Sequence, residues 1–262
     1  MKQIISSILL ACFIIVGLVV SNQSTRLTEA MSQTSHNAAE AYQAEKFAVA
    51  AVAYQQLVTS GVENSEVFYN LGNAYFKQGD IGRAIVNYRR AKLLAPRDGD
   101  IQANLGLAEQ QTKDQLDLNG ESTINRIAEV SQNWFTRNEM ALLALTLWFG
   151  LALLLFSLSQ IQSERGHEVA QYGAIVVGLL FMTSAVALGS RLYVEATQPA
   201  AVIVADKVDV SSGPGTQFVT QFTLHSGTQV HVLAQQESWV RLTLPGDQMQ
   251  GWVSKEAVEM VE

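Results

Sequence analysis

The sequence predicts a multidomain protein that combines an all-α domain of helical repeats, a two-helix transmembrane hairpin and a small all-β barrel. Small and aromatic residues recur around Leu71 and Gly72 with the spacing of a helix–turn–helix repeat. Two uncharged runs, Met140–Ser159 and Val169–Ser190, each have about the twenty residues that a membrane-spanning helix needs. From Ala200 onward, short β-rich runs alternate with glycine and proline turns, as in small barrels.

A further apolar run, Ile4–Val20, follows Lys2 at the N-terminus. This pattern predicts that residues 1–21 are a signal peptide or an N-terminal membrane anchor. Val19-Val20-Ser21 suits cleavage, whereas the length of the run suits retention, and both alternatives stay open. Either one exports the residues that follow.

The chain has one cysteine, Cys12, which lies inside this N-terminal run. Leu9-Leu10-Ala11-Cys12 has the form that precedes a lipid-modified cysteine in bacterial lipoproteins. Because apolar residues continue after Cys12, we favour a buried thiol in a hydrophobic helix. No intramolecular disulfide can form, so the fold is expected to depend on packing.

Residues 65–98 carry a spaced set of small and large residues at which two antiparallel helices would meet: Phe68, Leu71, Gly72, Tyr75, Ala84, Tyr88, Ala91 and Pro96. The set resembles the tetratricopeptide repeat. A weaker repeat precedes it at 31–64, and a further helix from Asp100 to about Leu116 is expected to cap the stack. These elements predict a repeat domain at 31–117, followed by a polar linker at 118–138.

The resemblance to tetratricopeptide repeats implies that the first helices line a concave groove that binds a polypeptide. Candidate groove residues are Tyr69, Asn73, Phe76, Lys77 and Asn104, with Glu66 and Gln111 at its margins. The alternative is that Tyr69 and Phe76 only pack against neighbouring helices. Ser35, Ala39 and Asp100 stand where carboxylate-binding relatives have Lys, Asn and Lys, which disfavours a ligand that ends in a C-terminal carboxylate.

The two uncharged runs predict transmembrane helices at 139–159 and 169–192, joined by a short cytoplasmic loop at 160–168. Trp134 and Arg137 precede the first helix, as is typical of the lipid–water interface. A short loop requires an antiparallel hairpin, so the repeat and barrel domains are expected on the same, extracytoplasmic side. The runs hold no ionisable residue, which argues against a proton or ion pathway.

Residues 198–262 contain several motifs in an order that resembles the bacterial SH3 domain: Val208-Asp209-Val210-Ser211-Ser212-Gly213-Pro214-Gly215-Thr216, Leu224-His225-Ser226-Gly227, Trp239 and Gly251-Trp252-Val253. Ser211 stands where the family usually has arginine, which weakens the assignment of a cell-wall peptide as ligand. Trp239 and Trp252 are candidate ligand-binding residues, although packing is the favoured alternative. His225 and His231 lack a third ligand nearby, so no metal site is expected.

Charge and motifs exclude several classes of function. The net charge is −7, and no cluster of Lys and Arg is present to neutralise phosphates, which argues against nucleic acid binding. No catalytic residue, nucleophile motif or phosphate-binding loop is found, and no cofactor is expected. The sequence therefore predicts a non-enzymatic, membrane-anchored adaptor. The alternative is an accessory or regulatory subunit that targets a cell-wall enzyme or a transporter through the SH3-like domain.

The order of the parts also resembles BatE-type proteins of bacterial aerotolerance operons. Exported repeats are followed by Asn-Leu-Gly-Leu-Ala at 104–108, a tryptophan and a two-helix hairpin, with a barrel at the end. The resemblance implies a multi-pass protein of the bacterial inner membrane whose partners are membrane proteins with von Willebrand A domains. It also implies a role in envelope or oxidative stress and carries over no catalytic residues. Peptidoglycan as a further ligand is what the bacterial SH3 resemblance implies.

Overall fold

The structure, a computed structural model, describes residues 29–114, 122–246 and 249–261. The signal peptide or anchor expected at 1–21, with Cys12, lies outside the described residues. The chain divides into two compact units, 1–63 and 64–262, and each is considered by itself.

The first unit contains two helices, at 29–43 and at α2 (Phe47–Thr59). Tyr42 and Phe47 stack edge to face across the turn between them, with ring centroids 5.2 Å apart. Shifting the repeat pattern back by 34 residues marks five positions, of which Ala38, Ala50, Tyr54 and Leu57 are buried and Ala41 is half-buried. The weak first repeat therefore folds as a helix pair with the expected sides turned inward.

The second unit begins with α3 (Ser65–Gln78), α4 (Ile81–Leu94) and α5 (Gly99–Glu109). Asn64 and Asp80 cap the first two helices by accepting backbone N–H groups, and Gly79 ends α3 with a φ of 82°, where a side chain would be strained. A Cβ on Gly72 would lie 2.7 Å from Tyr88 Cδ1, so only glycine lets α4 approach α3 this closely.

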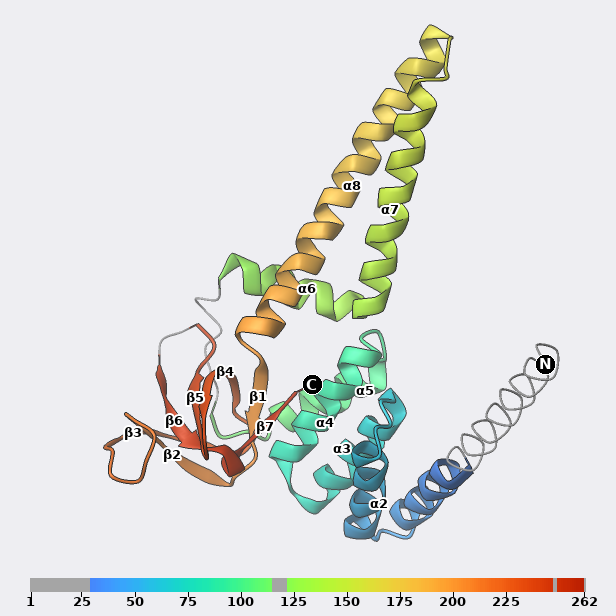
Figure 1. The fold of residues 1–262 in the computed structure, drawn as a ribbon. Helices are drawn as coiled ribbons and strands as arrows, with labels where there is room; N and C mark the ends of the chain where they lie inside the picture. Colours follow the sequence, from blue (N-terminus) through green and yellow to red (C-terminus); the bar gives the residue numbers. More distant parts are fainter. Residues whose placement is uncertain (1–28, 115–121, 247–248, 262) are drawn as a thin grey trace, which may run out of the picture. The chain divides into compact units, whose positions relative to one another are not determined.

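Three further helices follow: α6 (Thr123–Trp134), α7 (Arg137–Leu158) and α8 (Glu164–Thr197). Helix α6 lies where a polar linker was expected, at 118–138. Figure 1 shows α7 and α8 side by side as an antiparallel hairpin. Both are long and apolar enough, by length and composition, to cross a membrane. α8 extends beyond 169–192 at both ends, because Ser163 caps an additional N-terminal turn and Arg191 pairs with Glu195 in the last turns.

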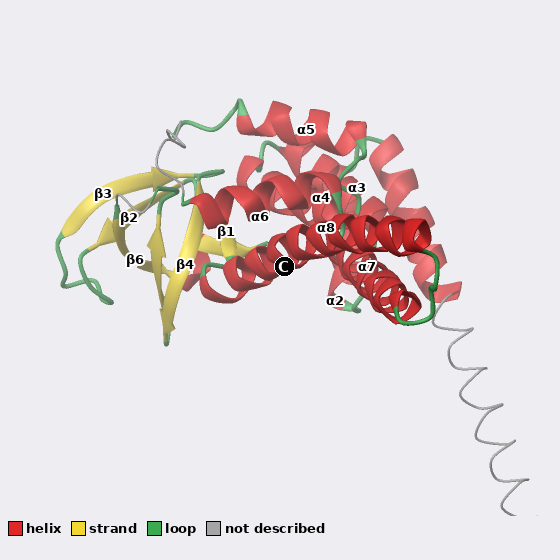
Figure 2. Cartoon of the chain, turned by 90° about the horizontal axis from the view of Figure 1, so that it is seen from above, coloured by secondary structure: helices red, strands yellow, loops and turns green. Residues whose placement is uncertain are grey.

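The C-terminal part is an antiparallel sheet of seven strands in the order β3-β2-β6-β5-β4-β1-β7. The strands are β1 (Ala200–Ile203), β2 (Lys207–Ser211), β3 (Thr220–His225), β4 (Gln229–Gln236), β5 (Trp239–Thr243), β6 (Gln250–Ser254) and β7 (Val258–Met260). Register shifts at Val210/Ser211 and Val232/Ala234 mark bulges, which bend a sheet. Figure 2 shows the strands in yellow beside the helices of this unit.

The core of the sheet is built from alternating apolar residues, including Ile203, Val210, Leu242 and Val253, none of which is measurably exposed. At Gly251 a Cβ would meet Val210 Cγ1 and lie 2.9 Å from the Ser211 carbonyl oxygen. Glycine is thus required where β6 passes over β2. Ser211, at the place of the expected arginine, has its hydroxyl 2.9 Å from the Gly213 carbonyl and 3.1 Å from that of Trp252.

Candidate functional site

Three of the predicted groove residues lie together on α3 and α5. Asn73 Oδ1 accepts a hydrogen bond from the Tyr88 hydroxyl at 2.7 Å and another from Asn104 Nδ2 at 2.9 Å. The same Asn104 nitrogen donates to the Tyr69 hydroxyl at 3.0 Å. Tyr88 is fully buried, so this network connects the core of the repeat to a half-exposed polar surface.

The network leaves polar groups of both asparagines for a ligand. Within the described residues, the Asn73 NH₂ group and the Asn104 Oδ1 atom make no hydrogen bond to the rest of the chain. Neither is among the buried polar atoms without a partner, so both face solvent. In this arrangement both Asn104 N–H groups are used, one by Asn73 and one by Tyr69. An ordered donor and acceptor are therefore presented on neighbouring helices.

The other predicted groove residues differ in their surroundings. Phe76 is half-buried and packs against the cluster of α4, α5 and Val202, which favours the packing alternative for this side chain. Lys77 is exposed one turn beyond Asn73. Tyr69 packs against Tyr88, with ring centroids 6.0 Å apart, and its hydroxyl accepts a hydrogen bond from Asn104.

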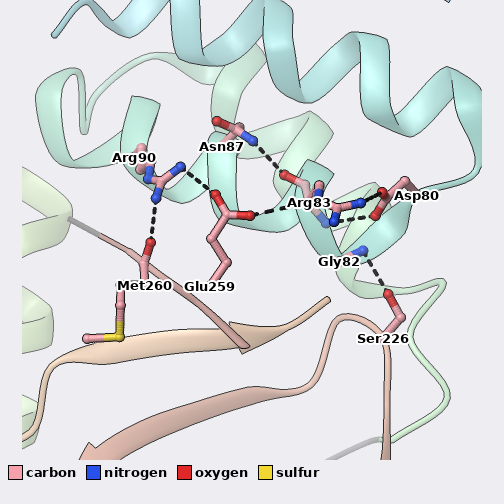
Figure 3. A network of polar contacts seen from close by, with 8 residues as sticks. All are labelled: Asp80, Gly82, Arg83, Asn87, Arg90, Ser226, Glu259 and Met260. Carbon is pink, nitrogen blue, oxygen red and sulfur yellow. Dashed lines mark hydrogen bonds and ion pairs between the residues drawn. The ribbon is translucent and has the colours of Figure 1, made fainter. Parts of the chain in front are cut away.

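The main feature that sequence analysis missed is the docking of α4 on the sheet, seen from close by in Figure 3. The Gly82 N–H donates to Ser226 Oγ at 3.1 Å. A Cβ on Gly82 would lie 2.6 Å from that oxygen, 2.7 Å from the Ile203 carbonyl oxygen and 2.9 Å from Val204 Cα. The helix backbone therefore touches the strand backbone, and Gly82 permits the contact.

Arg90 is the central charged residue of this contact. Its guanidinium donates to Glu259 Oε1 at 2.8 Å and to the Met260 carbonyl at 2.7 Å, as Figure 3 shows. Arg83 approaches the other Glu259 oxygen at 3.9 Å and pairs with Asp80 at 2.7 Å. Arg90 also lies over the ring of Phe68, with its central carbon 5.9 Å from the ring centroid. One acidic residue of β7 thus joins two arginines of α4.

An apolar contact and a second polar group extend the docking surface. Val202 of β1 belongs to the same buried cluster as Ile85, Tyr88 and Leu105. Beside it, Gln229 donates to Glu109 Oε1 at 2.6 Å, and Arg89 bonds both Glu109 and Gln229. Burial of apolar area and charge-assisted bonds together hold the repeat helices and the sheet as one body.

Asp114, a few residues after α5, accepts hydrogen bonds from the end of β3 and from the turn between β3 and β4. The Thr228 hydroxyl donates at 2.6 Å, the His225 backbone N–H at 2.7 Å, and His225 Nδ1 lies 2.8 Å from Oδ1. Burial raises the pKa of the Asp114 carboxyl, but the bonds from Thr228 and His225 outweigh it and hold this pKa below its ordinary value. His225 therefore contacts a carboxylate of the docking surface.

Protonation of Asp114 is expected to weaken the docking. Because the folded-state pKa is lowered, Asp114 stabilises the fold above its unfolded pKa, and this stabilisation is lost as pH falls through the folded value. We expect Asp114→Asn to lower the free energy of unfolding by about 2 kcal/mol at neutral pH. In thermal melts of the full-length protein in detergent, the difference from wild type should shrink as the pH falls below about 4, the ordinary pKa of an aspartate. A constant difference would contradict this role.

His225 and His231 do not converge on a common centre. His231 Nδ1 lies 3.0 Å from the Gln198 carbonyl, whereas His225 faces Asp114. In the part of the chain that the structure describes, no three His, Cys, Asp or Glu side chains form a group that could hold a metal ion.

Trp239 and Trp252 lie on the outer face of the sheet. Trp239 is opposite Ser254 and Trp252 is opposite Arg241, whereas the alternate pair Val240 and Val253 is buried. Because side chains alternate along strands, both tryptophans and Arg241 share the face turned away from the core. Both rings are half-buried. This face is the candidate ligand surface of the sheet.

Comparison with known proteins identifies one part of the chain. Residues 65–98, the segment that forms α3 and α4 with its flanking turns, match the tetratricopeptide repeat family. No curated protein matches the chain. The chain thus contains a tetratricopeptide repeat, a unit typical of protein–protein interaction scaffolds.

Proposed function

We propose that the protein is a non-enzymatic adaptor, anchored in a membrane, whose groove on α3 and α5 binds an extended segment of a membrane protein partner. The tetratricopeptide repeat supports a protein–protein interaction, and α7 and α8 supply two helices with the length and composition of membrane spans. The antiparallel hairpin leaves repeat and sheet on one side of the membrane. With the exported N-terminal segment, that side is extracytoplasmic and the membrane is the bacterial inner membrane.

The observation that carries the proposal is the amide pair of Asn73 and Asn104. An extended polypeptide offers a C=O and an N–H at each residue, which an amide NH₂ and an amide oxygen bind in a fixed register. The Tyr88 hydroxyl donates to Asn73 and the Tyr69 hydroxyl accepts from Asn104, which holds both amide side chains in place before a ligand arrives. Such preorganisation lowers the entropic cost of binding. Lys77, exposed on the same helix, adds a cation for an acidic partner residue.

The order of the parts supports a more specific identity as a BatE-type protein. On that identity the partners are membrane proteins with von Willebrand A domains, the sheet is a bacterial SH3-like domain, and the role lies in envelope or oxidative stress tolerance. The domain limits proposed from the sequence are 31–117 for the repeats and 198–262 for the SH3-like domain.

A photocrosslinking amino acid at Lys77 tests the groove in native membranes. Asn73→Asp keeps the Oδ1 acceptor for Tyr88 and Asn104 but replaces the free NH₂ donor with a carboxylate oxygen. We expect this change to reduce crosslinking from position 77 by roughly tenfold, because a ligand carbonyl would lose its donor and meet a negative charge. Crosslinking from exposed Lys255 in the same background serves as the control. Unchanged yields at position 77 would remove the groove from the mechanism.

The outer face of the sheet supports an alternative function. There Trp239, Arg241 and Trp252 offer two half-buried rings and a cation, which suits peptidoglycan or the surface of a cell-wall enzyme or transporter. The protein would then be an accessory subunit that targets its partner through the SH3-like domain. A crosslinker at Arg241 separates the two functions, since partners captured there and not from Lys77 would favour the alternative.

A further inference from the structure

Helix α6 carries an apolar stripe that the fold leaves uncovered. Ile124, Ile127, Val130 and Trp134 recur every three or four residues and so lie on one side of the helix. Ile124 is 43% exposed, Val130 56% and Trp134 64%. Exposure of large apolar side chains in a row is unusual on a surface that faces water.

The remaining sides of α6 have different surroundings. Ala128 and Ser131 are buried where the helix packs against α8. Glu129 is exposed on the side away from Val130 and Trp134, whereas Arg126, also exposed, lies one turn from Val130 at the edge of the stripe. The helix is therefore amphipathic, with one edge fixed to the hairpin, and its apolar stripe borders that edge.

The level of α6 along the hairpin is set by specific contacts. Only two residues separate α6 from α7, and the Phe135 carbonyl between them accepts a hydrogen bond from Arg191 at 2.9 Å. Arg191 stands directly after the uncharged run Val169–Ser190 of α8. Figure 1 shows α6 lying across the hairpin at the end nearest the sheet. The helix thus lies where the apolar surface of the hairpin ends.

We propose that α6 lies in the lipid–water interface of the bilayer, with Ile124, Val130 and Trp134 inserted among the lipids. The inference rests on the proposed membrane crossing of α7 and α8. Lipid, rather than a protein partner, is the occupant because the stripe continues through exposed Phe135 to the exposed leucines of α7. A tryptophan at the helix end, with Glu129 on the opposite side and Arg126 at the edge of the stripe, fits the pattern of interfacial helices.

The placement has a consequence for the groove. Arg97, in the turn between α4 and α5, donates to the Trp134 carbonyl at 2.9 Å. The repeat is thereby attached to α6 as well as to the sheet. An interfacial α6 holds the groove at a fixed height above the membrane, so the bound segment of the partner is one close to its own membrane helix.

Spin labels at single cysteines test the proposal in full-length protein, with Cys12→Ser, reconstituted into phosphatidylcholine–phosphatidylglycerol vesicles. Stripe labels replace Ile124 and Val130, a matched polar label replaces Glu129 on the opposite side of the same helix, and Leu153 of α7, 69% exposed, is the lipid reference. We expect the stripe labels to be accessible to oxygen and shielded from a water-soluble nickel chelate, as at Leu153. The label at Glu129 should be accessible to the nickel chelate and less accessible to oxygen.

Each other result overturns the inference in a recognisable way. If the stripe labels were as accessible to the nickel chelate as the label at Glu129, α6 would lie in water. Stripe labels shielded from both reagents would show that protein covers them. A label at Leu153 that is open to the nickel chelate would refute the membrane crossing itself, and with it the proposed function.

Discussion

Gly82→Ala is expected to separate the sheet from the repeat helices, although alanine is the better helix former. The new methyl group would lie 2.7 Å from the Ile203 carbonyl oxygen and 2.9 Å from Val204 Cα, both backbone atoms that cannot rotate away. Such overpacking costs about 1–3 kcal/mol, more than the gain in helix propensity of at most about 1 kcal/mol. Hydrogen exchange of full-length protein in detergent should accelerate in α4, in β1 and around Ser226, while α7 stays protected.

Gly106→Ala is the matched control, because Gly106 lies within α5 with nothing near the position of a Cβ. The same substitution there should stabilise the protein by about 0.5–1 kcal/mol through helix propensity alone. Opposite signs at the two glycines are therefore the expected result. If Gly82→Ala were as stable as Gly106→Ala, the backbone contact between α4 and the sheet would not exist in solution.

Tyr88→Ala is expected to produce the largest loss of stability in the repeat. The ring fills the space above Gly72 between α3 and α4, and it belongs to the cluster that reaches Val202 of the sheet. Removing a buried aromatic side chain costs about 3–5 kcal/mol, since the cavity closes only in part. Chemical denaturation of the detergent-solubilised protein, followed by circular dichroism, should show an early loss of helix.

Tyr88→Phe separates the hydroxyl group from the ring. It keeps the packing but removes the 2.7 Å hydrogen bond to Asn73, so stability should fall by only about 1 kcal/mol. The Asn73 amide would then be held by Asn104 alone, and crosslinking from Lys77 should fall while the repeat stays folded. If crosslinking from position 77 were undiminished in the Tyr88→Phe variant, the orientation of Asn73 would not limit binding.

The docking of the sheet on α4 also bears on how the adaptor would work. Contacts on α4 reach from Gly82 to Arg90, so the sheet occupies a long side of this helix, while Asn73 and Asn104 stand on α3 and α5. A ligand held by the two amides and a ligand on the Trp239–Trp252 face would therefore both be bound by the same compact unit. Linking two sites raises the effective concentration of the second ligand when the spacing fits.

Much of the fold could be predicted from local patterns. The family match confirms the tetratricopeptide repeat predicted at 65–98. The repeat is readable from the sequence because close helix packing requires small residues such as Gly72 opposite large ones such as Tyr88. The two long apolar helices and the antiparallel C-terminal sheet also have the expected order. The groove residues and the SH3-like identity stay predictions.

Helix α6 was missed although its apolar residues recur every three or four positions after Ser122, a residue type that caps helices. Its packing on α8, and other features, could not be read from such patterns. The groove position of Phe76 follows from the repeat pattern, yet its packing depends on Val202 of a distant strand. His225 was weighed only as a metal ligand, whereas Asp114, far away in sequence, is its neighbour.

By itself the sequence determined which segments become helices or strands and which pair of helices forms a repeat, since helical spacing, glycine positions and apolar run lengths act within one or two elements. Only the tertiary structure decided that the sheet binds α4. The bonds Gly82–Ser226 and Arg90–Glu259 join residues 144 and 169 positions apart. Each of these residues alone resembles an ordinary surface residue, and it becomes a contact only because two independently formed surfaces are complementary in shape and charge.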